Sequence, residues 1–279
     1  MSEPTILVEV ADGVGHLKFN RPKQLNAFNN ELMTAAIAAI GEFNAKSDVR
    51  AILVSGEGRA FSAGFDLKAA SDRSLETAAD WRRQLELQFD FIMSFWNARV
   101  PTIALVHGYC LAGAFEASLA CDMTIAAEDS FFGEPEVRFG SGAVAMLFPW
   151  VTGPKQAKEI MLTGDDRIPA ERALQMGLIN KIVPQDELKS EGRRVASRIA
   201  KAAPDSVEKS KLAINRSYDI MGFRNALAMG LDIDVDINST PTWEKQEFSR
   251  IRKEQGVKAA IAWHDARFAD KDNSEGKET

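Results

Sequence analysis

Two glutamates in apolar surroundings are the residues of this sequence best suited to acid–base chemistry. Glu116 stands between Phe115 and Ala117, and Glu136 follows an apolar run that begins at Phe131. Carboxylates are seldom fully buried without a partner, and burial raises their pKa from about 4.3 toward the range used in general acid–base catalysis. A solvated face or a structural salt bridge is the alternative role for each glutamate, and the pattern leaves both open.

Two glycine-containing segments, residues 58–67 and 107–116, each follow a short apolar run typical of a buried strand. Small residues let backbone N–H groups approach a ligand closely. The second segment also opens a helix, where backbone donors favour negative charge. Two such donors aimed at one point would form an oxyanion hole, and the alternative is a pair of ordinary strand-to-helix turns.

The usual nucleophile, metal and phosphate-binding patterns do not occur in the sequence. His16 lies in an expected strand, His107 precedes a turn and His264 lies in the C-terminal tail, so we expect structural or surface roles for them. Cys110 and Cys121 give neither a disulfide framework nor a zinc spacing, which is typical of a cytosolic protein with reduced thiols.

The apolar pattern predicts alternating strands and helices up to about residue 130, which indicates an α/β architecture. We expect a β-hairpin over residues 6–19 and a polar loop at 71–80. Buried strands are expected at 51–54, 102–106 and 123–127. Amphipathic or short helices are expected at 26–46, 81–96 and 114–121.

Strand signals fade after about residue 142, and the rest of the chain is predicted to be mostly helical. The expected helices are at 154–162, 169–176, 188–201, 206–218 and within 222–268. We therefore divide the chain into a core of residues 1–204 and a helical C-terminal section of residues 205–279.

Composition excludes several classes of protein. The 279 residues are 45% hydrophobic and 27% charged, which is close to the average for globular proteins. The formal charge of -6 disfavours general nucleic-acid binding. The acidic N-terminus is unlike a signal peptide, and no apolar run reaches 18 residues, so we expect a cytoplasmic protein without a transmembrane helix.

The sequence resembles the crotonase, or enoyl-CoA hydratase/isomerase, superfamily over nearly the whole chain. The segments that carry the resemblance are 20–27, 60–67, 108–116, 121–122, 132–136, 162–165, 170–178 and 182–184. The resemblance implies a spiral of β-β-α units whose C-terminal helices make trimer contacts, in a homotrimer or a dimer of trimers.

The resemblance also implies a site for acyl-CoA thioesters, with an enolate stabilised at the thioester oxygen. By position, the oxyanion donors are the backbone N–H groups of Phe65 and Gly113, and the two acids of the hydratase branch are Glu116 and Glu136. The expected coenzyme A and substrate contacts are Lys23, Gln24, Leu25, Ala63, Phe65, Asp66, Leu67 and Lys68. No metal or redox cofactor is implied, since coenzyme A is part of the substrate.

Three features depart from the family pattern. The usual three-glycine run is Ala112-Gly113-Ala114, which keeps the donor glycine. Residues 140–146 replace the Pro-Gly-x-Gly-Gly stretch that positions water in hydratases, and Arg138 has no assigned role.

We expect an enoyl-CoA hydratase that adds water across the 2,3-double bond of an acyl-CoA thioester. Glu136 is assigned mainly to the α-carbon proton and Glu116 mainly to water. The alternatives are another reaction on the same scaffold (isomerisation, dehydration of a hydroxyacyl-CoA or a retro-aldol lyase step) and a catalytically idle acyl-CoA binding protein.

Five aromatic side chains suggest a preference for flat or ring-bearing acyl groups. Large, rigid rings around the site would favour such groups over flexible chains. The alternative is packing in the core or between protomers. The five are Phe65, Trp81, Phe89, Trp96 and Phe115.

Overall fold

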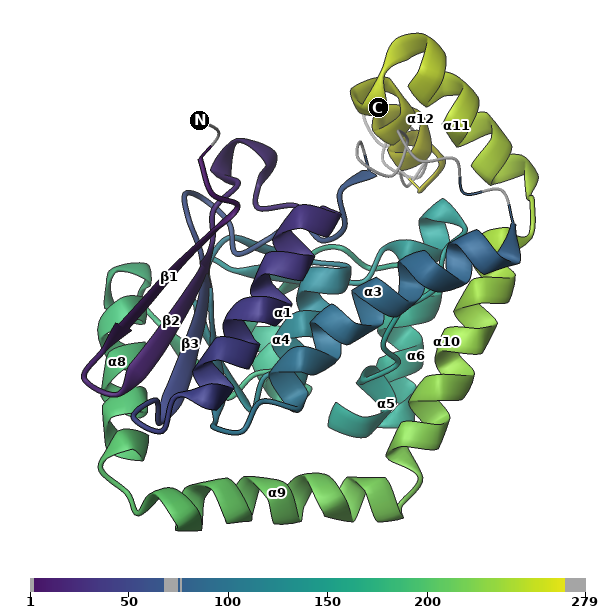
Figure 1. The fold of residues 1–279 in the computed structure, drawn as a ribbon. Helices are drawn as coiled ribbons and strands as arrows, with labels where there is room; N and C mark the ends of the chain where they lie inside the picture. Colours follow the sequence, from purple (N-terminus) through teal and green to yellow (C-terminus); the bar gives the residue numbers. More distant parts are fainter. Residues whose placement is uncertain (1–2, 68–74, 76, 269–279) are drawn as a thin grey trace.

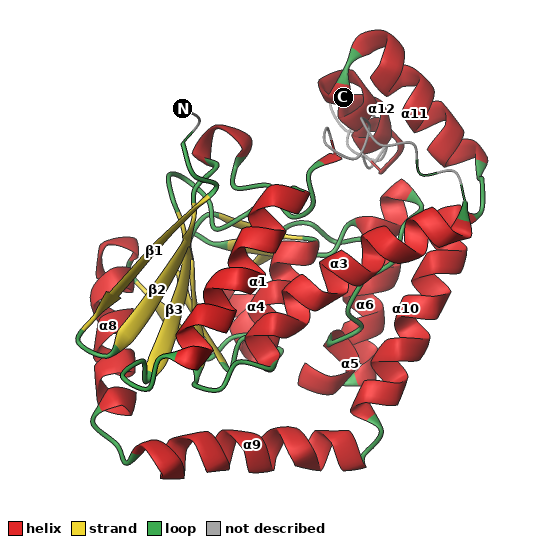
Figure 2. Ribbon diagram, in the orientation of Figure 1, coloured by secondary structure: helices red, strands yellow, loops and turns green. Residues whose placement is uncertain are grey.

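The computed structural model describes residues 3–67, 75 and 77–268 (Figures 1 and 2). Its strands form a six-stranded sheet in the order β1-β2-β3-β4-β6-β9 and a three-stranded sheet in the order β5-β7-β8. The strands are β1 (Ile6–Ala11), β2 (Val14–Phe19), β3 (Ala51–Gly56), β4 (Thr102–Val106), β5 (Tyr109–Leu111), β6 (Met123–Ala127), β7 (Phe131–Gly133), β8 (Ile168–Pro169) and β9 (Lys181–Val183).

The α-helices alternate with the strands as far as β9 and then follow one another to the C-terminal end. They are α1 (Asn30–Ala45), α3 (Ala78–Trp96), α4 (Gly113–Ala120), α5 (Phe148–Val151), α6 (Pro154–Thr163), α7 (Ala170–Gln175), α8 (Leu188–Ala200), α9 (Pro204–Ile220), α10 (Phe223–Ser239), α11 (Trp243–Gln255) and α12 (Val257–Phe268). Three short 3-10 helices are η1 (Pro22–Gln24), η2 (Glu136–Phe139) and η3 (Gln185–Glu187). The mixed α/β architecture is the predicted one.

Alternating side chains give the large sheet two apolar faces. Leu53 of β3 and Leu105 of β4 pack with α8, whereas Ile52 and Val54 of β3 belong to the larger core with α1, α3 and α4. Successive residues of a strand point to opposite faces, so continuous apolar runs mark strands that are covered on both sides. Figure 1 shows α8 behind the sheet and the other three helices in front of it.

The helix predicted over residues 26–46 begins at Asn30, so its predicted start was wrong. Leu25 and Asn26 adopt left-handed conformations with φ of 50° and 55°, which breaks the helical pattern. The side chain of Asn29 then accepts a hydrogen bond from the N–H of Leu32 and caps the helix. Residues 21–28 thereby lie beside the first glycine-containing segment, residues 58–67.

The polar loop predicted at 71–80 ends earlier than expected, because α3 begins at Ala78. Thr77 and Asp80 form a reciprocal capping box that fixes this start. The remaining predicted loop residues 71–74 and 76 lie outside the described part of the chain.

The four C-terminal helices leave the core and return to it. Figure 1 shows α9 running from α8 to α10, with α10 rising beside α3 toward α11 and α12. The helix α9 begins at Pro204, so the predicted boundary at residue 205 falls in its first turn. The division into a core of residues 1–204 and a C-terminal trimerisation section of residues 205–279 stays a prediction. Within the described residues, no helix is both long enough and apolar enough to cross a membrane.

Candidate active site

The two glycine-containing turns predicted to carry the oxyanion donors lie in contact. A Cβ added to Gly64 would be 2.6 Å from the Cβ of Ala112 and 3.4 Å from the nitrogen of Gly113. A Cβ added to Gly113 would overlap the ring of Phe65. Only glycine at both positions allows this approach, because any side chain would push the turns apart.

Both predicted donors have N–H groups that their own elements leave unused. Gly113 is the first residue of α4, and the first N–H groups of a helix have no partner within it. Phe65 pairs with Phe28, but the bonds of that bridge run from Phe28 N to Gly64 O at 2.8 Å and from Asp66 N to Phe28 O at 3.1 Å. Neither bond uses the N–H of Phe65. The geometry therefore suits two converging backbone donors.

Ala112 holds a strained backbone conformation at this turn, with φ of 56° and ψ of -135°. A residue with a Cβ adopts such angles at a cost of about 1–3 kcal/mol, and such strain is concentrated at functional sites. Its N–H donates to Gly133 O at 2.8 Å and its carbonyl accepts from Phe115 and Glu116. These bonds to β7 and α4 fix the turn that presents Gly113.

Glu136 lies on the wall of a cavity of about 500 Å³ between the core and the C-terminal helices. Phe65 of the first turn lines the same cavity, so the acid and one predicted oxyanion residue share one space. The described residues that line it are Phe65, Leu67, Leu75, Trp81, Leu85, Gln88, Glu136, Phe139, Ser141, Gly142, Val144, Asp234, Asn238, Lys245, Phe248, Ser249, Arg252 and Lys253.

Glu116 lies behind this wall rather than on it. The side chain is fully buried in α4, and its two carboxylate oxygens accept hydrogen bonds from the N–H groups of Val144, at 3.2 Å, and Ala145. Val144 lines the cavity, so Glu116 is one residue layer away from it among the described residues. The departure from the family pattern at 140–146 thus supplies the backbone that binds this acid.

Burial raises the pKa of four carboxyl groups in this region, those of Glu116, Glu134, Glu136 and Asp234. Burial first, and the charge of Asp234 second, raise the pKa of Glu136 to about 8. Burial raises the pKa of Asp234 to about 7, although the Gly142 N–H, Lys245 and Asn238 oppose the rise. The pKa values of Glu116 and Glu134 are raised well above their usual range, again chiefly by burial. At neutral pH Glu136 therefore holds a proton that it can deliver.

The two loops predicted to contact coenzyme A are held together. Ala63 N donates to Leu25 O at 2.9 Å, and Arg21 forms an ion pair with Asp66 at 2.8 Å. The buried amide of Asn26 donates to Glu57 O and Ala60 O at 2.8 and 2.9 Å. This explains why the chain needs a left-handed Asn26, whose side chain joins the two loops.

The expected coenzyme A residues are spread over this loop pair. Lys23 and Gln24 line a hollow of about 310 Å³ beside the N-terminal hairpin, whereas Leu67 lines the Glu136 cavity. Asp66 is engaged with Arg21. Lys68 lies outside the described residues.

Arg138, which had no assigned role, joins the Glu136 segment to α12. Its guanidinium reaches Asp166 at 3.3 Å and Asp265 at 3.2 Å and lies over the ring of Phe268. The backbone carbonyl of Arg138 bonds to His264 Nε2 at 2.6 Å. The C-terminal helices are therefore built into the active-site wall, a connection that no local pattern indicated.

Two of the five predicted aromatic rings lie at the Glu136 cavity, and the preference for flat acyl groups stays a prediction. Phe65 and Trp81 line the Glu136 cavity, but Phe89 packs against the core. The prediction was wrong for Phe115, which is fully buried between Phe132 and Phe148. It was also wrong for Trp96, which stacks on Phe223 at 4.6 Å. Phe115 points into the core, whereas Trp96 is partly buried and lines a different cavity. Sequence spacing alone does not distinguish these environments.

Asp234 and Glu134 are the acids that the sequence reasoning missed. Asp234 is 1% exposed on α10, on the same buried face as Leu227 and Leu231. A carboxylate at an apolar position of the helical repeat was the available signal. Glu134 is also 1% exposed, and neither of its oxygens has a hydrogen-bond partner among the described residues.

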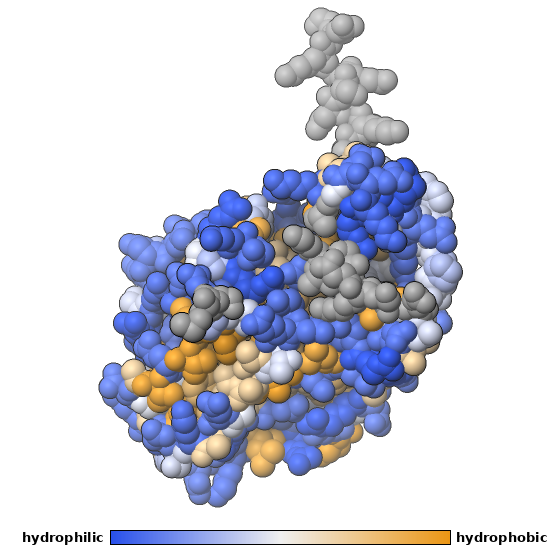
Figure 3. Space-filling view, turned by 45° about the horizontal axis from the view of Figure 1, so that its top comes forward, coloured by the Kyte–Doolittle hydropathy of each residue, from blue (hydrophilic) through white to orange (hydrophobic). Residues whose placement is uncertain are grey.

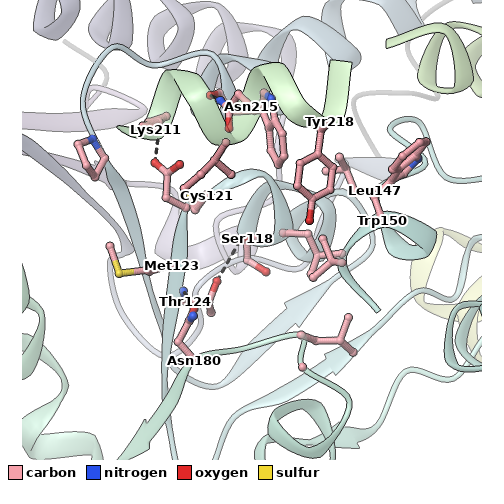
Figure 4. A pocket seen from close by; sticks show the side chains of 18 of the residues that line it. Ser118, Cys121, Met123, Thr124, Leu147, Trp150, Asn180, Lys211, Asn215 and Tyr218 are labelled. Carbon is pink, nitrogen blue, oxygen red and sulfur yellow. Dashed lines mark hydrogen bonds and ion pairs between the residues drawn. The ribbon is translucent and has the colours of Figure 1, made fainter. Parts of the chain in front are cut away.

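A second cavity, of about 660 Å³, lies between α9 and the core and contains none of the predicted site residues (Figure 4). Lys211 of α9 forms an ion pair with Asp122 at 2.7 Å, and Thr124 donates to Ser118 O at 2.9 Å. Figure 4 shows Tyr218 on the same helix as Lys211 and Trp150 at the right-hand end of this space. The larger volume does not make it the better candidate, because its charged groups already neutralise each other.

Comparison with known proteins confirms the class that this fold and site define. A family model described as Enoyl-CoA hydratase/isomerase matches residues 9–259. The chain therefore belongs to the enoyl-CoA hydratase/isomerase family, as the resemblance predicted.

The relatives agree in sequence and in structure. A crystal structure of an enoyl-CoA hydratase/isomerase from Xanthobacter autotrophicus Py2 is 45% identical, with a TM-score of 0.94 over 96% of this chain and 100% of that one. A probable enoyl-CoA hydratase of Mycobacterium bovis is 34% identical over 78% of this chain and 84% of its own length. A short-chain-enoyl-CoA hydratase of Clostridium acetobutylicum is 33% identical over 76% and 81%. These matches confirm the crotonase fold.

Proposed function

We propose that this protein is an enoyl-CoA hydratase that adds water across the 2,3-double bond of an acyl-CoA thioester. The observation that carries the proposal is the contact between the Phe65 and Gly113 turns beside the cavity that holds Glu136. The names of the relatives support a hydratase function. In this scheme the two backbone N–H groups bind the thioester oxygen as negative charge develops on it.

Hydration requires two proton transfers, and each of the two predicted acids is assigned one of them. Water forms a bond to the β-carbon and loses a proton, while the α-carbon of the enolate gains one. Glu136, with its pKa raised to about 8, delivers the α-carbon proton. Glu116 is assigned the proton from water; the N–H groups of Val144 and Ala145 favour its ionised form, although burial is the larger effect and raises its pKa. No metal or redox cofactor takes part.

Hydration of crotonyl-CoA by the purified protein tests the proposal directly. Loss of the absorbance of the conjugated thioester, with 3-hydroxybutyryl-CoA as the product, is the expected result. Absence of hydration with crotonyl-CoA and with longer 2-enoyl-CoA esters would overturn it.

Double-bond isomerisation is the second candidate, and the position of Glu116 favours it. The cavity wall carries Glu136 but not Glu116, and the isomerase-like branch typically keeps only the acid at the Glu136 position. Conversion of a 3-enoyl-CoA to the 2-enoyl-CoA without hydration would assign this reaction instead.

The proposal includes a homotrimer or a dimer of trimers. Met229, Ile233 and Ile237 lie four residues apart on α10 and are 62%, 55% and 36% exposed. A stripe of large apolar side chains at helical spacing is suited to burial against another protomer. Figure 3 shows a further hydrophobic area in the left half of one face, on the side where β1 and β2 lie in Figure 1 and away from α10. Light scattering that finds only monomer at micromolar concentration would reject the trimer.

We also propose that the protein acts in the cytoplasm and that its substrate is an acyl-CoA thioester. Neither a nucleic acid nor a membrane is a proposed partner. The two cysteines support a reducing compartment, because Cys110 and Cys121 are both buried and free. The proposed contacts for coenzyme A and substrate remain Lys23, Gln24, Leu25, Ala63, Phe65, Asp66, Leu67 and Lys68.

A further inference from the structure

Asp234 has no role in the hydration scheme, although burying it is expensive. It is 1% exposed, lies on the wall of the Glu136 cavity and comes from α10, far from the predicted motifs in sequence. Burying a carboxyl group without a full set of hydrogen bonds costs roughly several kcal/mol of folding free energy. A buried Asp234 therefore calls for a functional explanation.

One oxygen of Asp234 is fully engaged and the other is not. Oδ1 accepts from the N–H of Gly142 at 3.0 Å and from Nδ2 of Asn238 at 2.7 Å. Asn238 in turn accepts from the hydroxyl of Ser141 at 2.6 Å. Oδ2 is buried and has no hydrogen-bond partner within the part of the chain that the structure describes. The network fixes the carboxyl group and leaves one hydrogen-bonding atom for a ligand.

The polar cluster lies beside apolar surface that Phe65, Trp81, Leu85, Val144 and Phe248 contribute to the same cavity. The lining also includes the polar or charged residues Gln88, Glu136, Lys245, Ser249, Arg252 and Lys253. An acyl group in an apolar cavity gains from a polar substituent only where the wall offers it a partner. Ser141, Asp234 and Asn238 are such a place.

We propose that Ser141, Asp234 and Asn238 form a subsite for a hydroxyl group on the acyl chain, so that the preferred substrate is a hydroxylated 2-enoyl-CoA. The inference rests on the proposed hydratase function and names its substrate class. A hydroxyl suits Asp234 in either protonation state, because it donates to a carboxylate and accepts from a carboxylic acid. A site built for a hydroxyl discriminates strongly against an analogue that lacks it, because its buried polar groups are then left unpaired.

Paired substrates of equal size separate hydrogen bonding from chain length. 4-Hydroxybut-2-enoyl-CoA is compared with pent-2-enoyl-CoA, and 5-hydroxypent-2-enoyl-CoA with hex-2-enoyl-CoA; in each pair a hydroxyl replaces a methyl group. We expect kcat/KM to favour the hydroxylated member at least about tenfold in one pair. Preference for the methyl member in both pairs would overturn the subsite.

Substitution of Asp234 links the preference to this residue. Asp234→Asn keeps an oxygen for Gly142 and Asn238, and Asp234→Ala removes the group. We expect the hydroxyl preference to fall severalfold in the first variant and to vanish in the second. Asp236→Asn, an equal charge change on the exposed face of α10, is the matched control. A preference that survives in both Asp234 variants would assign it to other residues.

The binding affinity of saturated analogues, which the enzyme cannot hydrate, tests the hydroxyl subsite independently of catalysis. Calorimetry compares 4-hydroxybutyryl-CoA with pentanoyl-CoA, and 5-hydroxypentanoyl-CoA with hexanoyl-CoA, on the wild-type protein and the correctly folded Asp234→Asn variant. Tighter binding of a hydroxylated ester by the wild type alone supports the subsite even if no enoyl-CoA is hydrated. Equal binding within both pairs contradicts it, whereas missing turnover alone contradicts only the hydratase proposal.

Discussion

The two large cavities of this molecule differ in how their charged groups are satisfied. In the cavity beneath α9, Lys211 and Asp122 neutralise each other, and Lys211 also donates to Val100 O at 3.1 Å. In the Glu136 cavity two acids share one wall, and the charge of Asp234, after burial, raises the pKa of Glu136. The first cavity has the larger volume, but the second holds a buried carboxyl oxygen, Asp234 Oδ2, that has no hydrogen-bond partner among the described residues.

This difference separates a structural site from a reactive one. A buried opposite-charge pair is stable as it stands, so removing one member costs folding stability. Buried groups of like charge hold their protons near neutral pH and are available for proton transfer. Substitutions in the two cavities should therefore have opposite consequences: loss of activity in one and loss of stability in the other.

The largest effect is expected from Glu136→Gln. Removing an acid–base group should lower kcat at least about a hundredfold, while binding of an unreactive acyl-CoA analogue changes much less. We expect a similar loss for Glu116→Gln. Glu128→Gln, an exposed glutamate on a turn, is the control. Near-wild-type turnover by either site variant would remove that residue from its assigned role.

Lys211→Met should have the opposite profile. The Asp122 carboxylate, whose side chain is 22% exposed, would lose its buried counter-charge, at a cost of about 1–2 kcal/mol in the free energy of unfolding, while kcat/KM of the folded protein is retained. Lys209→Met is the matched control, because its ion pair with Asp205 is exposed and should contribute less than about 1 kcal/mol. Equal stability of the two variants in urea unfolding would contradict the structural role of the cavity.

The buried carboxyl groups should make stability fall as pH rises. Glu134, Glu136 and Asp234 have pKa values above those of the unfolded chain, so the folded state binds more protons between about pH 5 and 8. Their favourable contribution is complete below about pH 4 and is lost through pH 8. Glu134→Gln should reduce the slope by about 1 kcal/mol per pH unit, and the exposed Glu171→Gln should not. Thermal unfolding at several pH values measures this, and parallel curves for Glu134→Gln and wild type would refute it.

The smallest effect is expected for Trp81, whose ring lines the Glu136 cavity and would contact the acyl group. Trp81→Leu should lower kcat/KM for cinnamoyl-CoA about fivefold more than for crotonyl-CoA, because an aromatic pair contributes about 0.5–1.5 kcal/mol. Trp150→Leu, in the other cavity, should leave this ratio unchanged. A wild-type preference for decenoyl-CoA over cinnamoyl-CoA would end the idea of a flat acyl pocket.

Local sequence determined the elements and the predicted reactive turns. Apolar runs such as residues 51–54 and 102–106 are strands because they can be buried on both faces. The small residues around Gly64 and Gly113 permit a backbone contact that larger residues exclude. The family followed from motifs spread over the chain, and the family match over residues 9–259 confirms it.

Tertiary structure decided which of the predicted groups share a space. Glu116 and Glu136 look alike in the sequence, yet one is bound by the backbone of residues 144–145 and the other lines the cavity. Asp234 and the Arg138–Asp265 contact join α10 and α12 to the Glu136 segment across about a hundred residues of sequence. Periodicity reports which face of a helix is buried, but only the packing of distant helices decides whether that face meets a core, a cavity or another charge.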